Sequence, residues 1–157
     1  MGTAFKLFER IVRESTNIVS EGNDVLLHPF EIRNIHPSFP IKVRRLFDDG
    51  HCAEATFLAM KCVEKAVQKH SGKKEFGQKL MMSVFDKNKP LIQLNPLSNA
   101  SEEDEQEGYR FLFSGAVQGI RNPGGHEIEL SDDPDVCLDH LAFASLLLRR
   151  LERSGFK

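Results

Sequence analysis

The fold of this chain is decided by residues 101–126, which read SEEDEQEGYRFLFSGAVQGIRNPGGH. The opening serine and acids are typical of a helix start, because serine can cap the first turn and carboxylates are favoured at the positive end of the helix dipole. Apolar residues then recur at helical spacing as far as Ile120. Pro123 cannot continue a helix, so we expect this helix to end near Arg121.

Small residues interrupt the same helix at Gly108, Gly115 and Gly119. A glycine inside a helix costs about 1 kcal/mol relative to alanine. Such a cost is tolerated where the missing side chain lets another element approach closely. Several glycines in one helix therefore predict a closely packed neighbour.

The remaining chain is also mostly helical in its pattern. Helices are expected over 3–20, about 41–47, from about 51 to 71, roughly 76–85 and about 134–153, the last apolar on more than one face. Irregular segments over 25–40 and 88–99 contain prolines, and the alternation over 126–130 favours a brief strand or hairpin. No partner is evident for His28 or His36 in the first of these segments. An all-α helical bundle is the predicted fold.

Composition narrows the classes of function. A chain of 157 residues that is 40% apolar and 28% charged has room for one domain with a core. Its net charge of −2 gives no global attraction to nucleic acid, and no basic stripe is evident, so any RNA contact has to be local. No apolar run approaches the roughly 18 residues of a membrane span, so we expect no membrane association.

The cysteines and histidines show no metal-binding pattern. Cys52, Cys62 and Cys137 form no CxxC pair and are best explained as reduced thiols in a cytoplasmic protein. No set of His, Cys and Asp residues has metal-ligand spacing, and no glycine-rich phosphate loop is present. We therefore expect neither a metal nor a cofactor.

The best candidates for chemistry are Arg121, Asn122 and His126. A histidine exchanges protons near neutral pH, and an arginine presents a cationic fork that suits phosphate oxygens. Together they could cleave RNA without a metal: His126 would move the proton of the 2′-hydroxyl or of the leaving oxygen, and Arg121 would stabilise charge on the phosphate. The same residues also make an ordinary helix end, and the spacing alone favours that structural interpretation.

Five further residues are weaker candidates. His51 stands at a helix start, where capping is its simpler role, and it becomes an accessory site residue, with Arg45 or its neighbour Arg44, if that start lies near Arg121. Glu54 and Glu64 could orient a site arginine, although on an amphipathic helix each is better explained as a solvated charge.

The order of several motifs resembles a known superfamily. Arg121-Asn122-Pro123 followed by His126, after a helix rich in small residues and before a last apolar helix, resembles the HEPN superfamily. More closely, the chain resembles the Ymh-type family of conserved hypothetical bacterial proteins, a branch of that superfamily. The matching segments are 35–37 (IHP), 46–51 (LFDDGH) with Glu54-Ala55 after it, 108–116 (GYRFLFSGA) and 120–126 (IRNPGGH).

That resemblance implies an all-α HEPN-like domain over 35–157, with 1–34 as an extra N-terminal helix and connector. It also implies a homodimer whose two Arg–His motifs face each other, and metal-independent endoribonuclease activity in toxin–antitoxin, abortive-infection or other phage-defence roles. Arg121, Asn122 and His126 would act on an RNA substrate and leave a 2′,3′-cyclic phosphate and a 5′-hydroxyl. An antitoxin or operon partner would fit such a role.

Two alternatives stay open at this point. The HEPN superfamily includes catalytically silent members, so the chain could be a non-catalytic helical module that binds RNA or a protein partner. It could also be a scaffold or sensory domain whose dimerisation is its purpose, since the last helix is apolar on more than one face.

Overall fold

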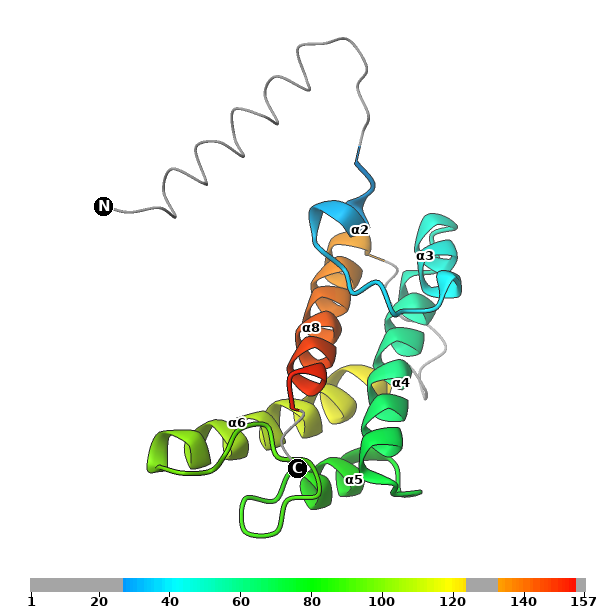
Figure 1. Ribbon diagram of the computed structural model, residues 1–157. Helices are drawn as coiled ribbons and strands as arrows, with labels where there is room; N and C mark the ends of the chain where they lie inside the picture. The colour runs from blue at the N-terminus through cyan, green and yellow to red at the C-terminus, as the bar shows by residue number, and fades with distance from the viewer. Residues whose placement is uncertain (1–26, 124–132, 155–157) are drawn as a thin grey trace, which may run out of the picture.

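The computed structural model describes residues 27–123 and 133–154 (Figure 1). The helix expected over 3–20 and the short strand expected over 126–130 lie outside these residues. The described residues form helices and no strand, which confirms the all-α prediction. Within that part of the chain, no helix combines the length and the apolar character that crossing a membrane requires.

The helices follow the predicted order with small differences at their ends. They are α2 (Pro29–Ile32), α3 (Ile41–Asp48), α4 (Cys52–Ser71), α5 (Gly77–Val84), α6 (Ala100–Ala116), the π-helix η1 (Val117–Arg121) and α8 (Pro134–Glu152). The cap of α6 is Asn99 rather than Ser101: the Asn99 side chain accepts a hydrogen bond from the backbone N–H of Glu102 at 3.0 Å. Asparagine caps a helix as well as serine does, so the residue type alone does not show which of the two is the cap.

The core lies where α4 and α8 pack along each other (Figure 1). α3 packs on α4, α5 pairs with α6, and η1 lies against α4. Each Leu or Phe side chain that is fully buried contributes about 1.5–3 kcal/mol to folding. The aromatic centre of the α5–α6 pair is Phe85 stacked on Phe113, with ring centroids 4.4 Å apart. The described residues cover one side of α8 and leave Val136 and Leu146 exposed.

The segment over 25–40 is not wholly irregular, because it contains the one-turn helix α2. Pro29 presets the backbone angle of the first helical position, and the His28 ring nitrogen Nδ1 accepts a hydrogen bond from the N–H of Phe30 at 3.1 Å. Both histidines of the segment have partners, contrary to the sequence-based expectation. His28 lies 2.6 Å from the Asp48 carboxylate and His36 lies 3.0 Å from that of Glu152, contacts that tie the segment to α3 and α8.

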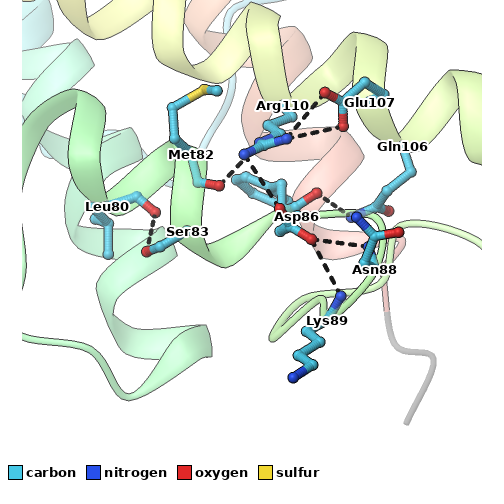
Figure 2. A network of polar contacts seen from close by, with 10 residues as sticks. Leu80, Met82, Ser83, Asp86, Asn88, Lys89, Gln106, Glu107 and Arg110 are labelled. Atoms are coloured by element: carbon cyan, nitrogen blue, oxygen red, sulfur yellow. Dashed lines mark hydrogen bonds and ion pairs between the residues drawn. The ribbon is translucent and has the colours of Figure 1, made fainter.

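The buried amide of Gln106 helps to hold the loop between α5 and α6 (Figure 2). Gln106 is fully buried. Its side-chain oxygen accepts a hydrogen bond from Leu94 N–H at 2.9 Å, and its nitrogen donates to the carbonyls of Phe85 at 3.1 Å and Ile92 at 3.0 Å. These bonds satisfy backbone groups that would otherwise be buried without a partner.

An ion-pair network joins the same two helices at the surface (Figure 2). Arg110 donates to the Met82 carbonyl at 2.9 Å and to Glu107 at 3.0 Å, and lies 3.3 Å from Asp86. The N–H of Asn88, donating to the Asp86 carboxylate, lowers the pKa of that group, and the charge of Arg110 adds to the effect. Together with Gln106, this network fixes the direction of α6 and hence of the motif at its end.

The outer side of α6 differs from the prediction. A Cβ added at Gly108, Gly115 or Gly119 would meet nothing within 4 Å, so the closely packed neighbour expected there is absent among the described residues. Phe111 and Leu112 lie on the same side of the helix and are 58% and 42% exposed. We call these five residues the glycine face. Its open space and apolar side chains are those of a contact surface that the described residues leave uncovered.

Candidate functional site

The helix that carries the motif changes its winding before it ends. After Ala116 the chain forms the π-helix η1, and the N–H of Asn122 donates to the carbonyl of Val117, five residues back, at 2.9 Å. A π-turn holds one extra residue compared with an α-turn, and such turns occur frequently at functional sites. The predicted end of the helix near Arg121 is confirmed, with Asn122 as its C-cap.

The Arg121 side chain makes three contacts, two of them with α4. One terminal nitrogen lies 3.6 Å from the Glu64 carboxylate. The other donates to the side-chain oxygen of Asn122 at 3.1 Å. The guanidinium carbon lies 5.6 Å from the centroid of the Phe57 ring, within the range of a cation–π contact. The guanidinium is thus oriented by its own neighbour in sequence and by two residues of α4.

Glu64 is buried, so its interpretation as a solvated charge is wrong. Its side chain is 4% exposed, against 23% for Arg121. Its second oxygen accepts a hydrogen bond from the N–H of Gly77, the first residue of α5, at 2.7 Å. A buried carboxylate is costly unless it is paired and hydrogen-bonded, and Glu64 is both. The sequence contained a signal for this role, since Glu64 directly follows buried Val63 and lies four residues after buried Met60.

The Arg121 guanidinium keeps hydrogen-bonding capacity. It has five N–H groups. Its Nε is buried and has no acceptor among the residues that the structure describes. A nearly buried donor without a partner costs about 1–3 kcal/mol. His126, the proton-transfer group of the proposed site, lies outside the described residues.

A small pocket lies beside the motif, between α4 and α8. Its volume is about 120 Å³. Ile120 and Pro123 border it on the motif side, Thr56 on α4, and Val136 and His140 on α8. Burial lowers the pKa of His140, and the opposing effect of Asp139 is smaller. The His140 imidazole is therefore neutral at neutral pH, as suits a partly buried structural histidine.

The accessory candidates are not joined to Arg121. His51 is exposed and is the N-cap residue of α4: its carbonyl accepts from Ala55 N–H at 3.0 Å, while its side chain makes no capping hydrogen bond. Arg45 is exposed on α3, and its neighbour Arg44 pairs with Glu31 at 2.8 Å. No hydrogen bond or ion pair connects the described side chains of His51 or Arg45 with that of Arg121.

A row of lysines lies on α4 beside Arg121. This row corrects the expectation that the chain has no basic stripe. Lys61, Lys65 and Lys69 are all exposed and follow at four-residue intervals, which places them on one side of the helix. The ammonium group of Lys61 lies 6.0 Å from the centroid of the Phe57 ring, the same ring that Arg121 contacts. The net charge of the chain does not reveal this row, because the acids at residues 102–107, at the start of α6, offset the charge of the lysines.

No group of three or more His, Cys, Asp and Glu side chains in the described part of the chain is placed to hold a metal ion. Cys137 accepts a hydrogen bond from Thr56 at 3.4 Å, and its thiol lies 3.3 Å from the carbonyl oxygen of Cys52.

The site as described is thus a cation anchored by a buried carboxylate, an amide and an aromatic ring, with lysines next to it.

Over residues 33–151 the chain matches the profile of one family, described as a protein of unknown function (Hypoth_ymh). The match covers about three quarters of the 157 residues, and the chain belongs to this family. No curated protein and no solved structure matches it. The Ymh-type assignment made from the ordered motifs is thereby confirmed, and the wider HEPN assignment stays a prediction.

Proposed function

We propose that this member of the Hypoth_ymh family is a metal-independent endoribonuclease of the HEPN kind, acting as a toxin or phage-defence effector in the cytoplasm. The observation that supports it most is the state of Arg121. A π-turn places this arginine at a helix end, a buried carboxylate orients it, and one of its donors has no described partner. Such a preorganised cation can stabilise a phosphate whose charge grows during reaction.

In the proposed reaction the 2′-oxygen of a ribose attacks the adjacent phosphorus while its proton is removed. The bond from phosphorus to the 5′-oxygen of the next nucleotide then breaks, and that oxygen takes up a proton. The products are a 2′,3′-cyclic phosphate and a 5′-hydroxyl. His126 transfers the proton in one of these steps, a contribution typically worth 10²–10⁴-fold. Arg121 binds the non-bridging oxygens, and Asn122 holds Arg121 through the 3.1 Å hydrogen bond.

The proposed enzyme is a homodimer built on the glycine face. The three glycines each cost about 1 kcal/mol relative to alanine, and nothing in the described chain fills the space beside them. A second copy packed helix to helix on this face would use that space and cover Phe111 and Leu112. Gly119 is two residues from Arg121 in the sequence, so a two-fold contact there would place the ends of the two motif-bearing helices near each other.

The test is cleavage of RNA in EDTA by the purified chain. The wild type should cleave, His126→Ala should lose at least about 100-fold in rate, and products should carry the cyclic phosphate. Arg121→Lys is the matched variant of choice, because Arg121→Ala would leave the buried Glu64 charge without its partner. Cleavage that is equal in the wild type and in His126→Ala would overturn the proposal.

One observation favours a second candidate, a non-catalytic module that binds RNA or a protein. The Arg121–Glu64 pair gives the arginine a structural role without any substrate. Under this alternative, RNA binding persists in the double variant Arg121→Lys, His126→Ala, and the wild type leaves every RNA offered uncut. RNA cleavage by the wild type and RNA binding by this double variant therefore distinguish the two candidates.

A further inference from the structure

We propose that Lys61, Lys65 and Lys69 form a track that binds the phosphates of single-stranded RNA and leads the strand to Arg121. This inference rests on the proposed function for the nature of its ligand. It concerns α4, a helix to which neither the motif nor the family match assigns a role. The occupant is argued from charge, spacing and continuity with the candidate site.

The first argument is the spacing of the charges. Residues four apart on an α-helix are about 6 Å apart along its axis, so the row from Lys61 to Lys69 extends over about 12 Å. All three side chains are exposed. Lys73 and Lys74, also exposed, directly follow Gly72, the C-cap of α4. A straight row of evenly spaced cations is complementary to a linear polyanion.

The second argument is that no described carboxylate forms an ion pair with the row. Glu64 is the only acid between residues 55 and 74, and it is buried against Arg121. Lys65 donates to the neutral side chain of Gln68 at 2.9 Å. Like charges four residues apart destabilise a helix by about 0.2–0.5 kcal/mol per pair, whereas a glutamate in the row would stabilise it. The helix dipole favours a cation at Lys69, in the last turn of α4, but it does not explain Lys61 and Lys65.

The third argument is continuity with the site. The Phe57 ring contacts both Arg121, at 5.6 Å, and Lys61, at 6.0 Å. The lysines thus continue the positive charge of Arg121 away from the motif. The acids at the start of α6 lie at the opposite end of a helix of 17 residues, about 25 Å long, whose continuation η1 packs on α4 (Figure 1). An RNA strand on α4 would therefore avoid this acidic segment.

The experiment measures binding without cleavage. The full chain carrying His126→Ala is titrated in EDTA with a fluorescein-labelled, unstructured RNA oligonucleotide, and anisotropy is followed at several salt concentrations. Each phosphate neutralised on a single strand contributes about 0.7 to the slope of log affinity against log salt, so three contribute about 2. Raising the salt fourfold should weaken binding by the parent roughly 20-fold more than binding by its variant K61Q/K65Q/K69Q.

Two matched variants control for folding and for net charge. K61R/K65R/K69R keeps the charges and should keep the slope. K42Q/K87Q/K89Q removes the same charge from exposed lysines elsewhere and should leave the slope as in the parent. Equal slopes in K61Q/K65Q/K69Q and in this control would overturn the track. The track would also be overturned if the parent protein bound vesicles containing phosphatidylserine through these lysines more tightly than it bound the RNA.

The failure of the track and the failure of the proposed function give different results. If the wild type cuts RNA and all binding slopes are equal, the ribonuclease stands and the track is wrong. If the wild type does not cut RNA but the slope falls by about 2 in K61Q/K65Q/K69Q, the track stands on a binding module.

Discussion

Replacing Glu64 by glutamine tests whether the Arg121–Glu64 ion pair organises the candidate site. Glutamine keeps an oxygen that can accept from Gly77 N–H, now 2.7 Å from the carboxylate, so the change removes mainly the charge. At the observed 3.6 Å and an effective dielectric constant of about 20, the attraction of the two charges is about 5 kcal/mol. Taking a carboxylate out of water costs several kcal/mol, which offsets most of that attraction.

The net effect should therefore be a loss of about 1–3 kcal/mol in the free energy of unfolding for Glu64→Gln. Arg121→Gln should cost more, about 3–5 kcal/mol, because it leaves a charge on a residue that is almost fully buried. Glu54→Gln is the matched control on the same helix: Glu54 is exposed in the first turn of α4, so losing its interaction with the helix dipole should cost less than about 1 kcal/mol.

The assay is urea unfolding followed by circular dichroism at one protein concentration, completed to a double-mutant cycle with both glutamines. Because each single variant breaks the same contact, the double variant should lose about 1–3 kcal/mol less than the sum of the two. Additivity within about 0.4 kcal/mol would refute the reasoning, since it would mean that the two side chains do not interact in solution.

Three further changes probe other parts of the chain. Gln106→Leu should lower the free energy of unfolding in urea by about 3–5 kcal/mol, because it strands three buried backbone groups; a loss below about 1 kcal/mol would contradict this role. The pKa of His140 is lowered by burial, so the unfolded chain binds the proton more tightly, and the stability that neutral His140 contributes should be complete above its ordinary pKa of about 6.5 and fall below it. His140→Gln should flatten this part of the stability–pH curve, and an unchanged curve would count against it. Gly115→Ala should weaken self-association in sedimentation experiments while adding up to about 1 kcal/mol to the stability of the separated chain, and undiminished self-association would remove the glycine face as the dimer contact.

Local signals in the sequence determined the helices. α8 begins where expected because Asp133 accepts hydrogen bonds from the N–H groups of residues 135 and 136, at 2.9 and 3.1 Å, and Pro134 occupies the first helical position. The helix with the motif ends where Pro123 forbids its continuation. Caps, breaks and apolar spacing act within one or two turns, so they can be read without the fold. The ordered motifs likewise identified the family before any packing was known.

Packing decided how Arg121 is held. Its counter-charge Glu64 lies 57 positions earlier in the chain, and only the contact of η1 with α4 brings the two together. The π-turn before Arg121 was also not predictable, because the same residues are compatible with an α-turn until the surroundings select the wider one. The sequence showed the spacing of the lysines at once, but only the tertiary structure placed Lys61, the first of them, on the same Phe57 ring as Arg121. Sequence thus determined that an arginine ends this helix, and long-range contacts decided which charges surround it.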